Sequence, residues 1–152
     1  MPDGYDRAKA WEQIVAFLRV CAPLAAANGA TIVIEPLRSQ ESNIINSVAE
    51  GAQLARDVDR PAIQLLVDGF HWAVNDRSIE AIVDNGPILR HAHIATTPNR
   101  RPPGAEECDL ATFFQALKKS GYDARISIEG KIENPELELP AALKIMKALW
   151  ER

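Results

Sequence analysis

Four short strand-like runs, each followed by a carboxylate or a histidine, constrain the fold of this chain more than any other feature. The runs are 31–34, 62–67, 89–92 and 125–128, and the site residues beyond them are Glu35, Asp68, His93 and Glu129. Apolar runs of this length, bounded by polar or glycine-containing sequence, are typical of buried parallel strands. Their separations are each about 30 residues, the length of one βα unit. The pattern predicts a parallel sheet whose carboxyl-terminal edge carries all four residues.

Amphipathic segments between these runs predict the helices that cover such a sheet. A leading helix, with apolar positions from Trp11 to Leu24 at three- and four-residue steps, is expected to end at Asn28-Gly29. Further helices are expected over 44–58 with Ser42 or Asn43 as N-cap, over 79–84, from the N-cap Asp109 to Ser120, and after Pro135 with Leu143 among its apolar positions. We therefore predict one α/β domain over residues 1–152, with a leading helix and four βα units.

Charge and composition restrict the ligand and the compartment. A formal net charge of -4 argues against a nucleic-acid surface. Two cysteines are too few for a disulfide framework, and no charged, apolar leader precedes Asp3, so we expect a reducing cytoplasm. The longest apolar stretch, 14–27, is interrupted by Arg19 and Pro23, so we expect no membrane span. The expected ligand is a small molecule.

Five motifs in the chain carry a resemblance to a known family. They are Ile34-Glu35-Pro36-Leu37, Asp68-Gly69-Phe70-His71, His91-Ala92-His93-Ile94, the stretch 99–104 and Ser127-Ile128-Glu129. In this order they resemble the second half of the sugar isomerases and epimerases of the xylose isomerase-like TIM-barrel superfamily. The chain is most similar to ketose 3-epimerases of the D-tagatose 3-epimerase type and to hydroxypyruvate isomerases.

The resemblance implies a metal site made of Glu35, Asp68, His93 and Glu129. In this family the matching residues bind one divalent ion, Mn²⁺, Mg²⁺ or Co²⁺. Three carboxylates and one imidazole suit these ions because they are hard donors that leave coordination positions open for substrate oxygens. His91, two residues before His93, is expected on the same face of its strand. We expect it to be either a hydrogen-bonded core histidine or a residue that contacts a metal ligand, and not a ligand itself.

The resemblance also implies the chemistry. A metal that coordinates the carbonyl oxygen and the neighbouring hydroxyl oxygen of a ketose, or of a small hydroxy-ketone, acidifies the C–H proton of the hydroxyl-bearing carbon. It also stabilises the resulting cis-enediolate. Glu35 and Glu129 match the residues that remove and return this proton. Glu41, His71 and Arg100 match residues that contact the substrate. The activity implied is that of a metal-dependent sugar isomerase or epimerase.

Two alternatives remain open on the same scaffold. One is another reaction class: a dehydratase of the inosose type, or a metal endonuclease, which the acidic charge and the three histidines disfavour. The other is a non-catalytic half-barrel fragment that keeps the metal site as a binding module.

The length predicts how such a chain assembles. A (β/α)₈ barrel takes roughly 250 residues, so this chain is expected to form half of a TIM barrel, with open edges at 31–35 and 125–129. We also expect an apolar inner face that includes Val33, Ile63, Leu65 and Ile126. Such a face favours a homodimer, or pairing with a separate N-terminal half-barrel.

Overall fold

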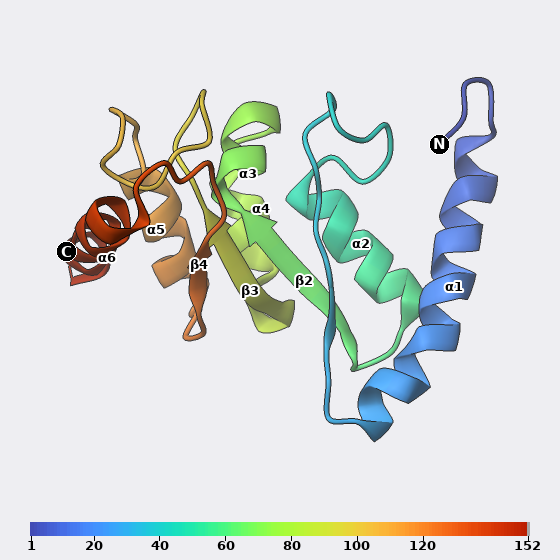
Figure 1. Cartoon of the computed structure of the whole chain (residues 1–152). Helices are drawn as coiled ribbons and strands as arrows, with labels where there is room; N and C mark the ends of the chain where they lie inside the picture. Colours follow the sequence, from blue (N-terminus) through green and yellow to red (C-terminus); the bar gives the residue numbers. More distant parts are fainter. Residues whose placement is uncertain (152) are drawn as a thin grey trace.

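The computed structural model describes residues 1–151. Its elements in chain order are α1 (Arg7–Ala27), β1 (Ile32–Ile34), α2 (Val48–Val58), β2 (Ile63–Asp68), α3 (Gly69–Asn75), α4 (Ile79–Asp84), the 3₁₀ helix η1 (Gly86–Ile88), β3 (Leu89–Ile94), α5 (Ala111–Lys119), β4 (Ile126–Ile128) and α6 (Pro135–Glu151). The strands form one parallel sheet in the order β1-β2-β3-β4 (Figure 1). The predicted α/β half-barrel, a leading helix followed by four βα units, is confirmed.

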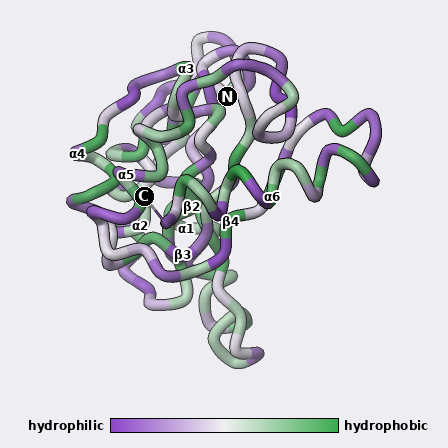
Figure 2. Tube along the Cα trace, turned by 90° about the vertical axis from the view of Figure 1, so that its left-hand side faces the viewer, coloured by the Kyte–Doolittle hydropathy of each residue, from purple (hydrophilic) through white to green (hydrophobic). Residues whose placement is uncertain are grey.

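The helices bury one face of the sheet through two hydrophobic clusters. In the smaller cluster, α1 packs on β1 and α2, and Leu18 and Ala22 join Ile34 and Leu54. The larger cluster contains Leu65, Val67, Ala92, Ile94, Phe113, Leu117 and Met146, from β2, β3, α5 and α6. In Figure 2 the hydrophobic colour is also plain on the lower end of α1, which projects beyond the rest of the chain.

The other face of the sheet is more polar than expected. Cross-strand pairing places Val33, Gln64, Leu66, His91 and Ser127 on the same face as the predicted ligands. Side chains alternate along a strand, so the residues that share a face with Asp68 are Leu66 and Gln64. Ile63 and Leu65 are buried beneath the helices instead, and Ile126 packs against the same core. The prediction of an apolar inner face was therefore wrong for these three residues.

The start of α2 also differs from the prediction. It begins at Val48 because Ser47, rather than Ser42 or Asn43, is its N-cap, with Ser47 Oγ accepting the Glu50 N–H at 3.1 Å. Glu50 reaches back to accept the N–H of Asn46, the residue before the cap, at 2.7 Å. Ser42 bonds within its own turn instead.

Three further helix predictions need correction or addition. The short α3 was not predicted, and it is capped by Asp68 at the end of β2. Leu110, not Asp109, is the N-cap of α5, although the Asp109 carboxylate still accepts the Thr112 N–H at 3.3 Å. Leu24 and Leu143 do not belong to the buried faces of α1 and α6, because their exposed fractions are 69% and 51%.

Helix α1 is long and apolar enough to cross a membrane by length and composition alone, a test that buried helices and signal sequences also pass. Its packing in the structure is that of a barrel helix. Helix α1 contributes to the smaller cluster. In addition, Arg19 of α1 donates to the backbone carbonyls of Asp57 and Val58 at 2.6 and 3.1 Å, and these bonds connect α1 to the end of α2.

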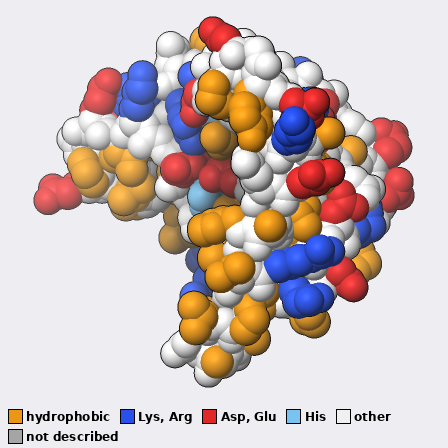
Figure 3. Space-filling model, turned by 90° about the vertical axis from the view of Figure 1, so that its right-hand side faces the viewer, with side chains coloured by type: hydrophobic (Ala, Val, Ile, Leu, Met, Phe, Trp, Pro, Cys, Tyr) orange, Lys and Arg blue, Asp and Glu red, His pale blue; other side chains and the backbone are white. Residues whose placement is uncertain are grey.

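Exposed hydrophobic side chains gather at both ends of the half-barrel. On α1, Phe17, Val20 and Leu24 are largely exposed, and hydrophobic side chains run along this helix in Figure 3. At the other end, Leu143 and Trp150 of α6 line an open groove beside Ile126 of β4, with a volume of about 280 Å³. Both ends are places where a closed barrel would continue.

Candidate metal centre

The four strand-end residues predicted as ligands lie together in the structure. One ligand atom from each of Glu35, Asp68, His93 and Glu129 lies within 4.8 Å of the corresponding atoms of the other three. The parallel register explains this meeting, because Asp68 is paired directly with His93, and the Glu129 N–H donates to the last carbonyl of β3, that of Ile94, at 3.2 Å. Each strand thus delivers one donor to the same edge.

Two atoms of this cluster lack the partners that buried polar atoms normally have. Among the described residues, Glu35 Oε1 and His93 Nδ1 are buried without a hydrogen bond. His93 Nδ1 lies 3.0 Å from Glu129 Oε2 and 3.4 Å from Glu35 Oε1, but neither contact has hydrogen-bond geometry. Because an unpaired buried polar group is costly, a shared cation between these atoms is a reasonable partner. The residues therefore fit a divalent ion with oxygen and nitrogen ligands.

The electrostatics of the cluster favour an added positive charge. Burial raises the pKa of Asp68 to about 6, against opposing effects of the Phe70 N–H and Arg100. Burial, and then the charge of Asp68, raises the pKa of Glu35. For Glu129, burial alone would raise the pKa, but the nearby charges of Arg100 and His93 leave it below its ordinary value. Burial therefore disfavours the ionised forms of Glu35 and Asp68, and a bound cation would stabilise them.

Arg100 reaches into the centre of the cluster from the loop after β3. Its Nη2 donates to Asp68 Oδ2 at 3.0 Å and to Glu129 Oε2 at 2.8 Å, and it lies 3.5 Å from His71 Nε2. Its backbone φ is 56°, a left-handed conformation that non-glycine residues seldom adopt. Such conformations are often held in place at functional sites.

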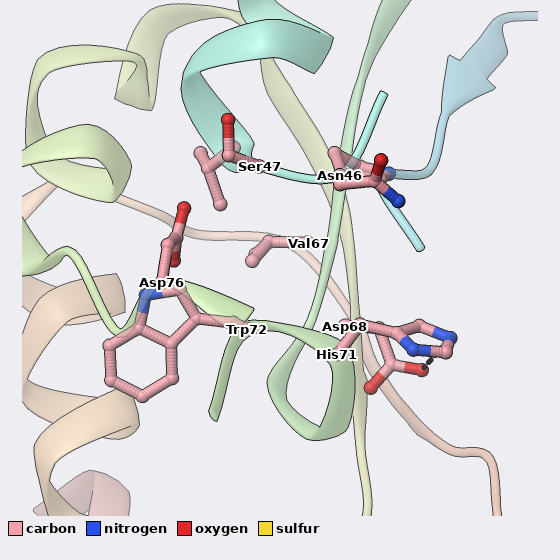
Figure 4. Close-up of a pocket in the computed structure, with 9 residues that line it drawn as sticks. Asn46, Ser47, Val67, Asp68, His71, Trp72 and Asp76 are labelled. Atoms are coloured by element: carbon pink, nitrogen blue, oxygen red, sulfur yellow. Dashed lines mark ion pairs between the residues drawn. The ribbon is translucent and has the colours of Figure 1, made fainter. Parts of the chain in front are cut away.

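His71 forms part of the same edge and is almost fully buried. Figure 4 shows it beside Asp68, with a contact of 3.8 Å from His71 Nε2 to Asp68 Oδ2, next to a cavity of about 10 Å³, close to the size of one water. Burial, with the charge of Arg100, lowers the pKa of His71, so the ring is neutral at pH 7. Its Nδ1 accepts the Arg38 N–H at 3.2 Å, so the ring proton must lie on Nε2, toward the cluster.

Glu41, predicted to contact substrate, lies on the turn after β1 rather than in the cluster. Its carboxylate accepts from Arg38 Nε at 2.6 Å. Arg38 was not predicted, and Phe70 appeared only as part of a family motif. The guanidinium carbons of Arg38 and Arg100 lie 4.8 and 5.0 Å from the Phe70 ring centre. The sequence signals that pointed to this region were Glu41 and the motif Asp68-Gly69-Phe70-His71.

His91 lies next to His93, as expected for a supporting residue. The two rings meet edge to face with their centres 5.0 Å apart, and His91 Nε2 is 2.9 Å from Ser127 Oγ. Burial, with the charge of His93, lowers the pKa of His91. A neutral His91 therefore forms part of the inner face just below the cluster.

Comparison with known proteins identifies the family to which the chain is similar. The model of the xylose isomerase-like TIM barrel family matches residues 1–149. The chain is 30% identical over 125 residues to D-psicose 3-epimerase of Ruminiclostridium cellulolyticum, covering 82% of this chain and 42% of that protein. It is 30% identical over 141 residues to 2-oxo-tetronate isomerase of Pectobacterium atrosepticum, covering 88% of this chain and 54% of that protein.

A solved structure of D-psicose 3-epimerase with D-tagatose, from Clostridium cellulolyticum H10, has the same fold. It superposes with a TM-score of 0.89 at 24% identity, covering 97% of this chain and 59% of that chain. The chain spans about half the length of the curated relatives it matches.

Proposed function

Because this chain belongs to the xylose isomerase-like TIM barrel family, we propose that it is the metal-bearing half of a sugar isomerase or epimerase. Its substrate would be a ketose or a small hydroxy-ketone. Relatives named as ketose epimerases and as a tetronate isomerase support this class of substrate. The two cysteines are free, which agrees with a cytoplasmic location as part of the proposal.

The observation that carries the proposal is the convergence of Glu35, Asp68, His93 and Glu129 within 4.8 Å. These residues come from four separate strands, so sequence proximity does not explain their meeting. The unpartnered Glu35 Oε1 and His93 Nδ1 support a role as ligands. Mn²⁺, Mg²⁺ and Co²⁺ suit this donor set.

The bound ion would polarise the substrate carbonyl and acidify the neighbouring C–H. Glu35 and Glu129 are the groups that move the proton in this proposal. The carboxylate of Glu35 is made more basic by burial, which suits a general base near neutral pH. Glu129, about half exposed, is the second carboxyl group and exchanges a proton on its open side. Return of a proton to the opposite face of the same carbon gives epimerisation, and return to the former carbonyl carbon gives isomerisation.

Three other side chains would hold the substrate. His71 presents the N–H of its Nε2 toward the site, so it can donate to a substrate oxygen. Arg100 offers a guanidinium beside the ligands. Glu41 takes part at the mouth through its pair with Arg38. Contact of these three residues with substrate belongs to the proposal.

We further propose that activity requires a second half that closes the sheet. A barrel of this type has eight strands inside a ring of helices, and here β1 and β4 end the four-stranded sheet. The missing walls would hold substrate, whereas the metal ligands all come from this half.

The ends of the half-barrel favour a complementary partner over a second copy. Helix α1 packs outside β1, and α6 packs beside β4, so each end of the sheet already carries a helix. If two copies closed one barrel, β4 of one copy would pair with β1 of the other. Helix α6 of the first copy and α1 of the second would then both cover this junction, the seam between the copies. A segment of four strands joined by three helices avoids this overlap, and we therefore propose it rather than the homodimer.

The function is tested by solvent deuterium exchange with D-psicose as the probe, on the chain assembled with its complementary half. We expect Mn²⁺-dependent deuterium incorporation next to the carbonyl, and its loss in Glu35→Gln and Glu129→Gln. Glu136→Gln, an exposed carboxylate on α6, is the matched control and should retain exchange. Exchange at the wild-type rate in either active-site variant would remove the proposed roles.

A further inference from the structure

We propose that Arg100 is a built-in counter-cation that competes with the metal for the same two carboxylate oxygens. Metal binding would then displace the guanidinium and free it to face the substrate. This inference rests on the proposed function, since it needs a metal at this site, but it concerns a property that the function alone does not require.

The available oxygens are few. Asp68 Oδ1 accepts the Phe70 N–H at 2.7 Å, as the cap of α3, so Oδ2 is the oxygen that remains for a metal. On Glu129, Oε2 is the oxygen that lies 3.0 Å from His93 Nδ1 and therefore faces the cluster. Arg100 Nη2 bonds to both of these oxygens. An ion ligated by the same atoms would lie close to the guanidinium, and two cations at such a distance repel.

The chain holds Arg100 in this place from several sides. Its N–H donates to the Thr96 carbonyl at 3.1 Å, and its own carbonyl accepts the Lys131 N–H at 2.7 Å. Gly130 permits this approach, since a Cβ there would lie 2.5 Å from the Arg100 carbonyl oxygen. The loop after β3 is thus fastened to the residues that follow Glu129.

The guanidinium is held less completely than the backbone. Its Nε is buried without a partner among residues 1–151, and the group stacks beside Phe70. Its binding in the cluster depends on one nitrogen, Nη2, that serves both carboxylates. A single bridging nitrogen is weaker than the two parallel bonds of a bidentate pair. A divalent ion can therefore displace it, while the fixed backbone keeps the side chain next to the open face of the site.

Arg38 provides a matched control. Its guanidinium carbon lies 4.8 Å from the same Phe70 ring, but its side chain pairs with Glu41 and not with the metal ligands. Arg38→Gln removes one positive charge near the site without touching the contested oxygens. At physiological ionic strength, removing a charge that makes no direct contact is expected to change Mn²⁺ affinity by less than about threefold.

The experiment is calorimetric titration of Mn²⁺ into the metal-stripped full chain, the Arg100→Gln variant and the Arg38→Gln variant. We expect Arg100→Gln to bind Mn²⁺ at least about tenfold more tightly than the wild type, because loss of charge-assisted bonds to both oxygens removes the competitor. Arg38→Gln should match the wild type. Unchanged or weaker binding in Arg100→Gln would overturn the inference while leaving the metal site in place. No Mn²⁺ binding in any of the three proteins would overturn the proposed function and this inference together.

A measurement on the unmodified chain covers the case in which Arg100→Gln does not fold. Mg²⁺ is diamagnetic, so the guanidinium N–H signals of arginine can be followed by NMR during its addition. We expect the Arg100 guanidinium to change from restricted to free rotation as Mg²⁺ binds, because its bonds to Asp68 and Glu129 break. Binding of Mg²⁺ with every arginine guanidinium signal unchanged would contradict the proposed competition.

Discussion

Replacing Asp68 with asparagine is expected to flatten the pH dependence of the metal-free chain's stability. Burial raises the pKa of Asp68 from 3.8 to about 6 in the folded chain, whereas the unfolded chain releases the proton near the ordinary value. Asp68 therefore favours the folded state fully below the unfolded pKa, and this contribution is lost as pH rises through about 6. The shift amounts to about 3 kcal/mol in total, of which about 2 kcal/mol falls between pH 4.5 and 7.5.

The assay is urea unfolding in EDTA at these two pH values. The fall in unfolding free energy between them should be smaller in Asp68→Asn than in the wild type by about 2 kcal/mol, because an amide does not titrate. Asp123→Asn, an exposed aspartate with no hydrogen bond among the described residues, is the control and should follow the wild type. Equal pH dependence in Asp68→Asn and wild type would refute the claim that Asp68 is buried at an energetic cost.

Three further expectations follow from the structure. Mn²⁺ at 100 times its dissociation constant should stabilise the chain by about 2.7 kcal/mol and raise its thermal midpoint by roughly 5–10 °C, and Asp68→Asn should abolish this rise in a thermal scan. Leu65→Ala should lower the unfolding free energy by about 2–5 kcal/mol, because Leu65 is fully buried, whereas Leu137→Ala, at a site 70% exposed, should change it by less than about 0.5 kcal/mol in the same urea assay. Sedimentation equilibrium of the chain alone should give no discrete dimer at micromolar concentration; a stable dimer would contradict the seam argument and favour the homodimer.

The ligand cluster could be predicted from the sequence because it depends only on strand order and strand ends. Consecutive βα units give a parallel sheet with all carboxyl ends on one edge, so a donor after each strand is enough to place Glu35, Asp68, His93 and Glu129 together. Strand order and strand ends are enough to place the four residues, without knowledge of side-chain positions. Errors in the helix boundaries do not change this result, as the start of α2 at Val48 rather than at residue 44 illustrates.

Other features depend on local competition that the sequence does not display. Ser42, Asn43 and Ser47 are all suitable N-caps for α2, and only the fold of the loop decides among them. The face of each strand was harder to predict, because Leu66 shares a face of β2 with Gln64 and Asp68 and so interrupts the alternation of apolar and polar residues. Leu65 could have been assigned to the helix side by counting back three residues from Asp68, a predicted ligand, because side chains alternate along a strand.

The contacts of the Arg100 side chain could not be predicted from the sequence. A resemblance can place an arginine near a substrate, but it cannot show that its guanidinium bonds to Asp68 and Glu129, two of the proposed metal ligands. That contact joins the loop after β3 to β2 and to the end of β4, all within this half of the barrel. This half therefore contains the proposed metal ligands, the carboxylates proposed to transfer protons, and an arginine that pairs with two of them. What it lacks are the walls beyond β1 and β4, so metal binding should be a property of this chain alone, and turnover a property of the closed barrel.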